Sequence, residues 1–525
     1  MDDSDDEHDE EGAGEECHQR PGYDSGHDAD PNSALESESH RRQRPTRRAL
    51  LKASALALAG ATAGCPDPLR TDGADSGSTP TRTSRPTRTG DASPGPDATP
   101  TGSETDAPPR SGTGTETPNS TPTSAEPRLL YVAADGDDGN VGSRTDPLRG
   151  LSAALERAVP GTTVRLQGGT YRPNRTIGAQ SLAGTPDEPV VVEADPVADE
   201  RPVFDFANAD VGGMRFSDCQ WLELSGFSVW NAPSRGLFVE RGSSDVLVED
   251  VSVFASGGDP DASGVGVFVF DSRRVTLRRV TSQNNYDPSS GGNNADGIAI
   301  ERSPGTLVES CVSRGNSDDG IDLWQTTETT VRQCWSYDNG YAPDGTAAGD
   351  GDGFKLGGGN GSGDNLVRRC LAFDNRVRGF DDNGATRPVT LYNCTAWRNA
   401  VDFRLGCRFD LEEPACPAHR LRNNLSAGGD VQLSPFVDSA ANSWEREIDD
   451  PGFASIDRED EAFLHLSADS PAVDAGVDVG LSYQGDAPDL GAFEFVPAST
   501  PTPRESRPVV SSSPGRQVLL GRGGP

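Results

Sequence analysis

A repeat in the middle of the chain constrains its fold more than any other feature of the sequence. In each copy an apolar residue stands three positions before a small or apolar residue, and an asparagine or small residue follows five positions later. The small or apolar residue of successive copies is Phe227, Val251, Val280, Cys311, Cys334, Cys370 and Cys394, at spacings of 24, 29, 31, 23, 36 and 24 residues. The asparagines are Asn285, Asn316, Asn339, Asn375 and Asn399. A constant minimum length with variable insertions predicts a stack of equivalent units, which is a solenoid.

The repeated segments predict strands. They are short, alternating and rich in β-branched residues, and no long helical pattern follows Val159. Propellers and leucine-rich repeats are alternatives, but neither the Trp-Asp signature nor the Leu-x-x-Leu-x-Leu pattern occurs. We predict an all-β protein, a parallel β-helix with about three strands per coil, a core of repeat cysteines and an asparagine ladder at one corner. Residues 147–159 should form a short capping helix, and the block ending at Val496 should cover the other end, because open ends expose strand edges.

Composition divides the chain into five parts. Residues 1–40 are acidic and expected to be disordered, or to precede the true start of the protein. Residues 41–65 resemble a twin-arginine lipoprotein signal, with Arg47 and Arg48, an apolar run too short to span a bilayer, and Cys65 as the lipidated residue. Residues 66–127 are a Ser/Thr/Pro-rich linker, 128–497 one folded domain, and 498–525 a disordered tail. We therefore expect an extracellular protein, exported by the twin-arginine route and anchored to the membrane through a lipid on Cys65.

The charge of the chain excludes one class of partner. Its formal net charge is −36, with 83 acidic against 47 basic residues, whereas nucleic-acid binding requires clustered Lys and Arg. Acidity with almost no lysine is typical of a protein kept soluble in concentrated salt, so we expect a halophilic source. We also expect a monomer. Outside the cell, Cys407 and Cys416, which flank a short loop, could either pair or stay free.

A column of polar residues is predicted on the outside of the solenoid. Four repeats align as Asp296-Gly-Ile-Ala299, Asp319-Gly-Ile-Asp322, Asp352-Gly-Phe-Lys355 and Arg378-Gly-Phe-Asp381. Because side chains alternate along a strand, the apolar residues of these segments point inward together. Ala299, Asp322, Lys355 and Asp381 should then form one column on the solvent side, with Lys355 next to Asp322.

The aspartates of these repeats predict a metal site. Asp296, Asp318, Asp319 and Asp322 fall on two adjacent coils, where four carboxylates would repel one another unless a cation joins them. Oxygen ligands without nearby histidine or cysteine select a hard ion, Ca²⁺ before Mg²⁺. Lys355, the one lysine after residue 65, is then either a base beside this site or simply an ion-pair partner of the aspartates.

The run from about Asn293 to Asn399 resembles polysaccharide lyase family 9, the calcium-dependent pectate lyases with a right-handed parallel β-helix. The resemblance is carried by the segments Asn294-Ala-Asp296-Gly, Asp318-Asp319-Gly-Ile-Asp322-Leu-Trp324, Asn339-Gly-Tyr341, Gly353-Phe354-Lys355-Leu-Gly-Gly, Arg378-Gly-Phe-Asp381 and Leu391-Tyr-Asn-Cys-Thr-Ala. It implies an enzyme that binds catalytic Ca²⁺ through Asp296, Asp318, Asp319 and Asp322 and uses Lys355 as base. The implied substrate is a polygalacturonate-like anionic polysaccharide, cleaved by β-elimination.

The chemistry of β-elimination fits these residue types. The base removes the proton at C5 of a uronide, and Ca²⁺ on the adjacent carboxylate stabilises the developing charge and acidifies that proton. Arg376 and Arg378 could hold neighbouring uronate carboxylates, or could instead pair with Asp381 or Asp382.

Two other functions remain open from the sequence. The first is a non-catalytic carbohydrate-binding or adhesion β-helix in which Ca²⁺ only stiffens the coils. The second is a polygalacturonase-like hydrolase, which needs two carboxyl groups and no metal. The sequence lacks the Gly-His-Gly and Arg-Ile-Lys motifs of such hydrolases, so this alternative ranks last.

Overall fold

The computed structural model describes residues 128–258, 263–407 and 415–497. The predicted acidic segment 1–40, the export signal 41–65 with Cys65, the linker 66–127 and the tail 498–525 lie outside the described residues and stay predictions. Within the described ranges, no helix has both the length and the apolar character that crossing a membrane requires.

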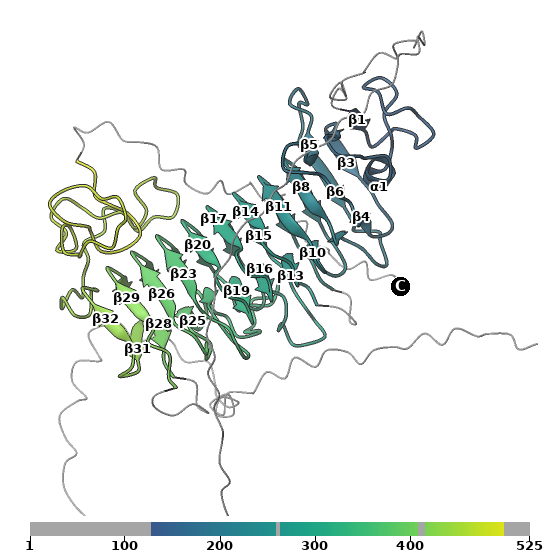
Figure 1. Cartoon of the computed structure of the whole chain (residues 1–525). Coiled ribbons are helices and arrows are strands. Elements are labelled where there is room, and N and C mark those ends of the chain that lie inside the picture. The colour runs from purple at the N-terminus through teal and green to yellow at the C-terminus, as the bar shows by residue number, and fades with distance from the viewer. Residues whose placement is uncertain (1–127, 259–262, 408–414, 498–525) are drawn as a thin grey trace, which may run out of the picture. The chain divides into compact units, whose positions relative to one another are not determined.

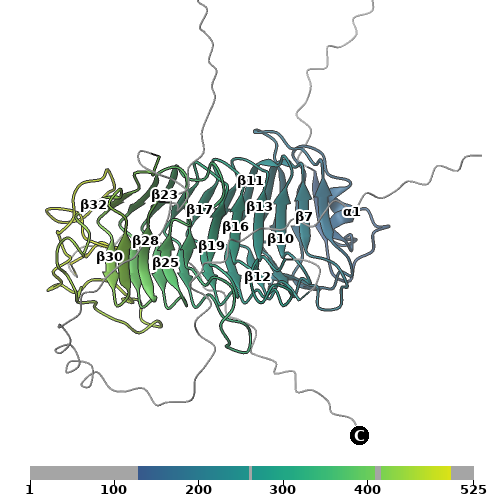
Figure 2. The same ribbon diagram turned by 90° about the horizontal axis from the view of Figure 1, so that it is seen from below.

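The described residues form three parallel sheets, and each coil from β2 to β31 contributes one strand to each sheet, whereas β1 and β32 add a strand to the first sheet only. The first sheet is 12-stranded and the other two are 10-stranded, with neighbouring strands supplied by successive coils. Figures 1 and 2 show the strands stacked side by side from the coil next to α1 to the last coil. This is the predicted parallel β-helix.

The bounds of the elements follow this order in each sheet. The first sheet contains β1 (Leu129–Val132), β2 (Thr163–Leu166), β5 (Val190–Ala194), β8 (Gln220–Ser225), β11 (Ser244–Glu249), β14 (Thr276–Arg278), β17 (Leu307–Glu309), β20 (Thr330–Arg332), β23 (Asn365–Arg368), β26 (Val389–Tyr392), β29 (Arg420–Arg422) and β32 (Asp438–Ala440). The second sheet contains β4 (Ile177–Gln180), β7 (Met214–Ser217), β10 (Leu237–Glu240), β13 (Val267–Phe270), β16 (Ile298–Glu301), β19 (Ile321–Trp324), β22 (Phe354–Lys355), β25 (Arg378–Asp381), β28 (Val401–Leu405) and β31 (Asp430–Leu433). The third sheet contains β3 (Gly169–Tyr171), β6 (Pro202–Asp205), β9 (Ser228–Trp230), β12 (Ser252–Phe254), β15 (Thr281–Gln283), β18 (Val312–Arg314), β21 (Trp335–Tyr337), β24 (Leu371–Phe373), β27 (Thr395–Trp397) and β30 (Leu425–Ala427).

The interior of the solenoid is apolar because alternate residues of every strand point into it. Ile298, Ile300, Ile321, Leu323, Phe354, Leu356 and Phe380 are all fully buried in the main core, as the strand alternation predicts. The phenyl rings of Phe354, Phe380 and Phe403 stack on successive coils, with centroid separations of 4.7 and 5.0 Å. The repeat cysteines Cys311, Cys334, Cys370 and Cys394 are buried free thiols in the same core.

The asparagine ladder forms at a corner between the third and second sheets. The side-chain amide of each asparagine donates to the carbonyl oxygen of the next, at 2.7 Å from Asn285 to Asn316, 2.9 Å to Asn339, 2.9 Å to Asn375 and 3.0 Å to Asn399. The same oxygens accept the backbone N–H of the preceding asparagine. The ladder therefore satisfies backbone groups that a sharp buried turn would leave without partners.

Replacing Asn339 by alanine should lower the free energy of unfolding by about 3 kcal/mol, because several buried hydrogen-bonding groups lose their partners. The change removes the acceptor for the Asn316 amide and backbone N–H, and the donor to Ser336 and Asn375. Denaturant titration measures the loss. Asn208→Ala at an exposed position is the control and should change the value by less than about 0.5 kcal/mol. Equal effects of the two substitutions would contradict this account of the ladder.

The first coil is capped as predicted. The helix α1 (Leu151–Leu155) lies within the expected segment 147–159 and buries Leu151, Ala154 and Leu155. It packs against β1 and β4 at the N-terminal end of the solenoid.

The prediction that the C-terminal block covers the other end is wrong for most of its length. Trp444 does pack against Phe403 near the last coils, with ring centroids 5.2 Å apart. The segment that follows instead lies along the outer face of the third sheet, where Phe463 contacts Trp335, Phe373 and Trp397. The physical reason is that the outward residues of β21, β24 and β27 are large and apolar, and this segment removes them from water. Cys407 and Cys416 form a disulfide, which settles the open question about this pair.

Candidate active site

The predicted column lies on the outer face of the second sheet. Strand pairing places Ala299 beside Asp322, Asp322 beside Lys355, and Lys355 beside Asp381. The register read from the repeats is therefore confirmed.

The exposure predicted for this column is wrong. Asp322 is 8% exposed, Lys355 2% and Asp381 1%, so the column is buried although it points away from the core. The segment between β21 and β22 contributes to the burial of Lys355, because its Asp350 contacts the amine. Within it, Gly349 packs so tightly on Asp318 that a side chain at position 349 would come within 2.5 Å of the carboxylate.

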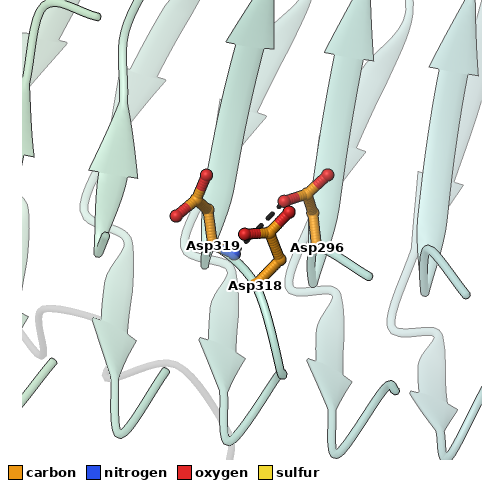
Figure 3. Close-up of side chains that lie close together, drawn as sticks. All are labelled: Asp296, Asp318 and Asp319. Atoms are coloured by element: carbon orange, nitrogen blue, oxygen red, sulfur yellow. Dashed lines mark hydrogen bonds between the residues drawn. The ribbon is translucent and has the colours of Figure 1, made fainter. Parts of the chain in front are cut away.

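Three of the four predicted metal ligands form a tight cluster at the start of the adjacent strands β16 and β19. One carboxylate oxygen from each of Asp296, Asp318 and Asp319 lies within 4.8 Å of the other two. In Figure 3 the carboxylates of Asp296 and Asp318 lie next to each other, and a dashed line marks the Asp319 N–H donating to Asp296 Oδ1 at 3.2 Å. Asp322, the fourth predicted ligand, lies outside this close group.

Backbone donors hold the carboxylates in place. The Asn294 and Asp350 N–H groups donate to the two oxygens of Asp318 at 2.6 and 2.7 Å. The Asp352 N–H donates to Asp319 Oδ1 at 2.7 Å. The cluster is therefore built by three segments: the turns before β16 and β19, and the segment before β22.

The electrostatics of the cluster favour a cation. Burial, followed by the charges of neighbouring carboxylates, raises the pKa of Asp318 to about 8 and the pKa of Asp296 well above its ordinary value. The pKa of Asp322 is also raised well above its ordinary value, primarily by burial, and Lys355 partly offsets this. Several buried acids on adjacent coils are costly to ionise together unless positive charge is supplied.

The donor set fits Ca²⁺. Every candidate ligand atom is a carboxylate oxygen, and Asp322 Oδ1 is a buried oxygen that accepts no hydrogen bond from the described part of the chain. Hard divalent cations prefer such oxygens, and Ca²⁺ tolerates the irregular arrangement that Mg²⁺ does not. Asp296, Asp318 and Asp319 could hold the ion, with Asp322 beside them.

Lys355 forms the ion pair that the sequence offered as an alternative to its role as base. Its Nζ donates to Asp350 Oδ2 at 2.8 Å and lies 2.9 Å from Asp319 Oδ2. The second contact is an ion pair at hydrogen-bonding distance. Burial alone would lower the pKa of Lys355, but the charges of Asp319, Asp322, Asp350 and Asp318 raise it well above its ordinary value. Through these two contacts Lys355 serves as a counter-ion of the cluster.

Arg376 and Arg378, the predicted substrate-binding arginines, both contact other groups of the protein. The Arg376 guanidinium donates to the carbonyl oxygens of Gly349 and Asp350. These hydrogen bonds stabilise the position of the segment between β21 and β22. Arg378 lies 3.3 Å from Asp352 Oδ2 and 3.5 Å from Asp381 Oδ2. The pairing of Arg378 with Asp381 is thus one of the alternatives that the sequence left open.

The sequence reasoning missed Asp350. This residue lies on no strand, so the repeat alignment gave it no place, yet it contacts Lys355 directly. The alternating run Gly349-Asp350-Gly351-Asp352-Gly353 was the available signal, since it holds two carboxylates immediately before β22. Asp352, which the alignment included without a role, is fully buried.

Comparisons with known proteins agree with this geometry. The family model described as "Pel9A-like, right handed beta helix region" matches residues 130–424. Pectate lyase L of Dickeya dadantii is 31% identical over 401 residues, covering 70% of this chain and 90% of that protein. Pectate lyase PEL9 of Emericella nidulans is 29% identical, covering 62% of this chain and 86% of that protein. The crystal structure of pectate lyase Pel9A superposes with a TM-score of 0.60 at 28% identity, covering 70% of this chain and 96% of that one.

Proposed function

The chain belongs to the family of Pel9A-like right-handed β-helices and is a polysaccharide lyase of the pectate lyase type, and from this premise we propose its substrate, metal and base. The substrate is a polygalacturonate-type polyuronide, cleaved by β-elimination. The metal is Ca²⁺, held by Asp296, Asp318, Asp319 and Asp322. The base is Lys355.

One observation carries the proposal: Lys355 and the acid cluster meet on the outer face of adjacent strands. The amine lies 2.9 Å from Asp319, which is itself a member of the cluster. A base and a candidate metal site in contact match the needs of elimination next to a carboxylate, where one group takes the proton and positive charge stabilises what remains.

Each part of the elimination is assigned to a group at this site or to solvent. Lys355 takes the proton from C5, the electron pair forms the C4–C5 double bond, and the C4–oxygen bond breaks; the departing oxygen then gains a proton from solvent. The backbone donors to Asp318 and Asp319 keep the cluster fixed while charge develops. When bound, Ca²⁺ would supply positive charge that stabilises the charge developing next to the uronate carboxylate, and it would offset the aspartates that favour protonated Lys355.

The test is to incubate the full-length protein with polygalacturonate in concentrated salt, with and without Ca²⁺. We expect a UV-absorbing unsaturated product that forms with Ca²⁺ and disappears when a chelator is added. Binding without any product would instead support a carbohydrate-binding protein. New reducing ends without ultraviolet absorption would support a hydrolase.

A further inference from the structure

A second row of residues crosses the same face of the solenoid. Its members stand two positions before the first inward-pointing apolar residue of each second-sheet strand from β10 to β25. We call it the pre-strand row, and it consists of Arg235, Val265, Asp296, Asp319, Asp352 and Arg378. A glycine follows each member, and its N–H donates to the carbonyl oxygen of the next member, at 3.0, 2.9, 3.0, 2.9 and 2.8 Å along the row. The row is therefore continuous, and Arg235 stands two coils from Asp296, roughly 10 Å at the usual strand spacing.

Arg235 differs from the other arginines on this face because its guanidinium forms no ion pair or hydrogen bond with any residue that the structure describes. Its Nε is buried without a partner. The two acidic residues whose charges act on Arg235 already pair with other arginines: Glu240 with Arg215 and Arg241, and Glu301 with Arg302. Arg235 is thus a surplus positive charge at one end of a row whose centre is acidic.

Two stacked phenylalanine rings fix the position of the Arg235 guanidinium. The Arg235 guanidinium lies 5.0 Å from the ring centroid of Phe238 and 5.3 Å from that of Phe268. The two rings are themselves stacked, with centroids 5.0 Å apart and planes inclined by 6°. Contact with ring faces fixes a guanidinium without neutralising it. A partly buried guanidinium without a direct ion-pair or hydrogen-bond partner gains free energy when an anion binds it.

We propose that Arg235 binds a carboxylate of the polyuronide substrate, so that the polysaccharide extends from the acid cluster along the pre-strand row toward the N-terminal coils. The inference rests on the proposed function, because it takes the substrate to be a polyuronide. Two features of the row support this occupant: a positive charge that complements uronate groups, and backbone continuity with the candidate active site. Arg235 and Lys355 are four strands apart, roughly 19 Å, so Arg235 meets a sugar several units from the cleaved bond.

Kinetics with long and short substrates test the inference. Arg235→Gln should raise KM for polygalacturonate about tenfold, the loss expected for one charge-assisted hydrogen bond, with kcat changed less than about twofold. KM for trigalacturonate should not change, because a trimer bound at Lys355 is too short to reach Arg235. Arg235→Lys keeps the charge and should lie between the wild type and Arg235→Gln.

Arg302→Gln is the matched control. Arg302 also lies over a phenylalanine ring of this face, 4.2 Å from the centroid of Phe270, but it is paired with Asp271 and Glu301. The Arg302→Gln substitution should leave KM unchanged for both polygalacturonate and trigalacturonate. If Arg235→Gln lowers only the melting temperature, or raises KM equally for polymer and trimer, the inference is overturned and Arg235 is structural.

Direct binding separates this inference from the proposed function. Calorimetry with polygalacturonate and with fully methyl-esterified pectin should show that Arg235→Gln weakens only the first, about tenfold, because the ester carries no charge. If the wild type forms no unsaturated product but Arg235→Gln still loses binding to polygalacturonate, the proposed reaction fails and the carboxylate site stands. If both proteins bind polygalacturonate equally, the site fails whatever the reaction.

Discussion

Replacing Lys355 by arginine should lower kcat on polygalacturonate by about a thousandfold, within the range that a general base contributes. Arginine keeps a positive charge next to Asp319 and Asp350, so the buried carboxylates retain a counter-ion. It does not give up its proton in a protein and therefore cannot act as base. The rate of formation of unsaturated product measures the effect.

Arginine separates the role of base from the ion pair better than alanine does, because alanine would leave buried acids without their partner. The control is Arg387→Lys at an exposed ion pair with Asp364, which should leave turnover unchanged. If Lys355→Arg kept more than about a tenth of the wild-type rate, Lys355 would be a structural counter-ion and not the base.

Removing Ca²⁺ should abolish turnover and lower the melting temperature. An ion at the cluster would stabilise only the folded protein, because the unfolded chain does not bring Asp296, Asp318 and Asp319 together. Asp319→Asn removes a charge from the cluster, so Ca²⁺ should then change turnover and melting temperature less than it does in the wild type. Asp364→Asn at an exposed position should leave both responses to Ca²⁺ unchanged. Calorimetric titration with Ca²⁺ and thermal melts measure the two effects.

The stabilisation by Ca²⁺ should also depend on pH. The folded pKa of Asp318 is raised to about 8, so near pH 5 the folded protein holds protons that the ion must displace. Raised folded pKa values also mean that the metal-free protein loses stability as pH rises from the ordinary range of aspartate towards pH 8. The shift in melting temperature on adding Ca²⁺ should therefore be larger at about pH 8 than at about pH 5. A shift that is the same at both values, or absent from the wild type, would argue against a cation at this cluster.

Periodic features of the sequence predicted the periodic features of the fold. Strand alternation fixes which side chains share a face, so the inward set from Ile298 to Phe380 and the neighbours Asp322 and Lys355 follow from the repeat alone. The asparagine ladder follows for the same reason, since each asparagine occupies an equivalent corner.

Non-periodic segments account for what the sequence did not predict. The position of the segment before β22 depends on tertiary contacts, so neither the burial of Lys355 nor its contact with Asp350 could be read from the repeat. The C-terminal segment follows the outer face of the third sheet because of scattered aromatic residues such as Trp335 and Phe463. The missing partner of Arg235 is likewise a property of the assembled face and not of any one segment.

Mass spectrometry of the products tests the central claim most directly, namely that Lys355 beside the acid cluster performs elimination. The account predicts that wild-type protein with Ca²⁺ yields from polygalacturonate a set of fragments that lack one water, and that Lys355→Arg yields almost none. Fragments that all carry the added water of hydrolysis would contradict it, and so would equal amounts of unsaturated fragments from both proteins.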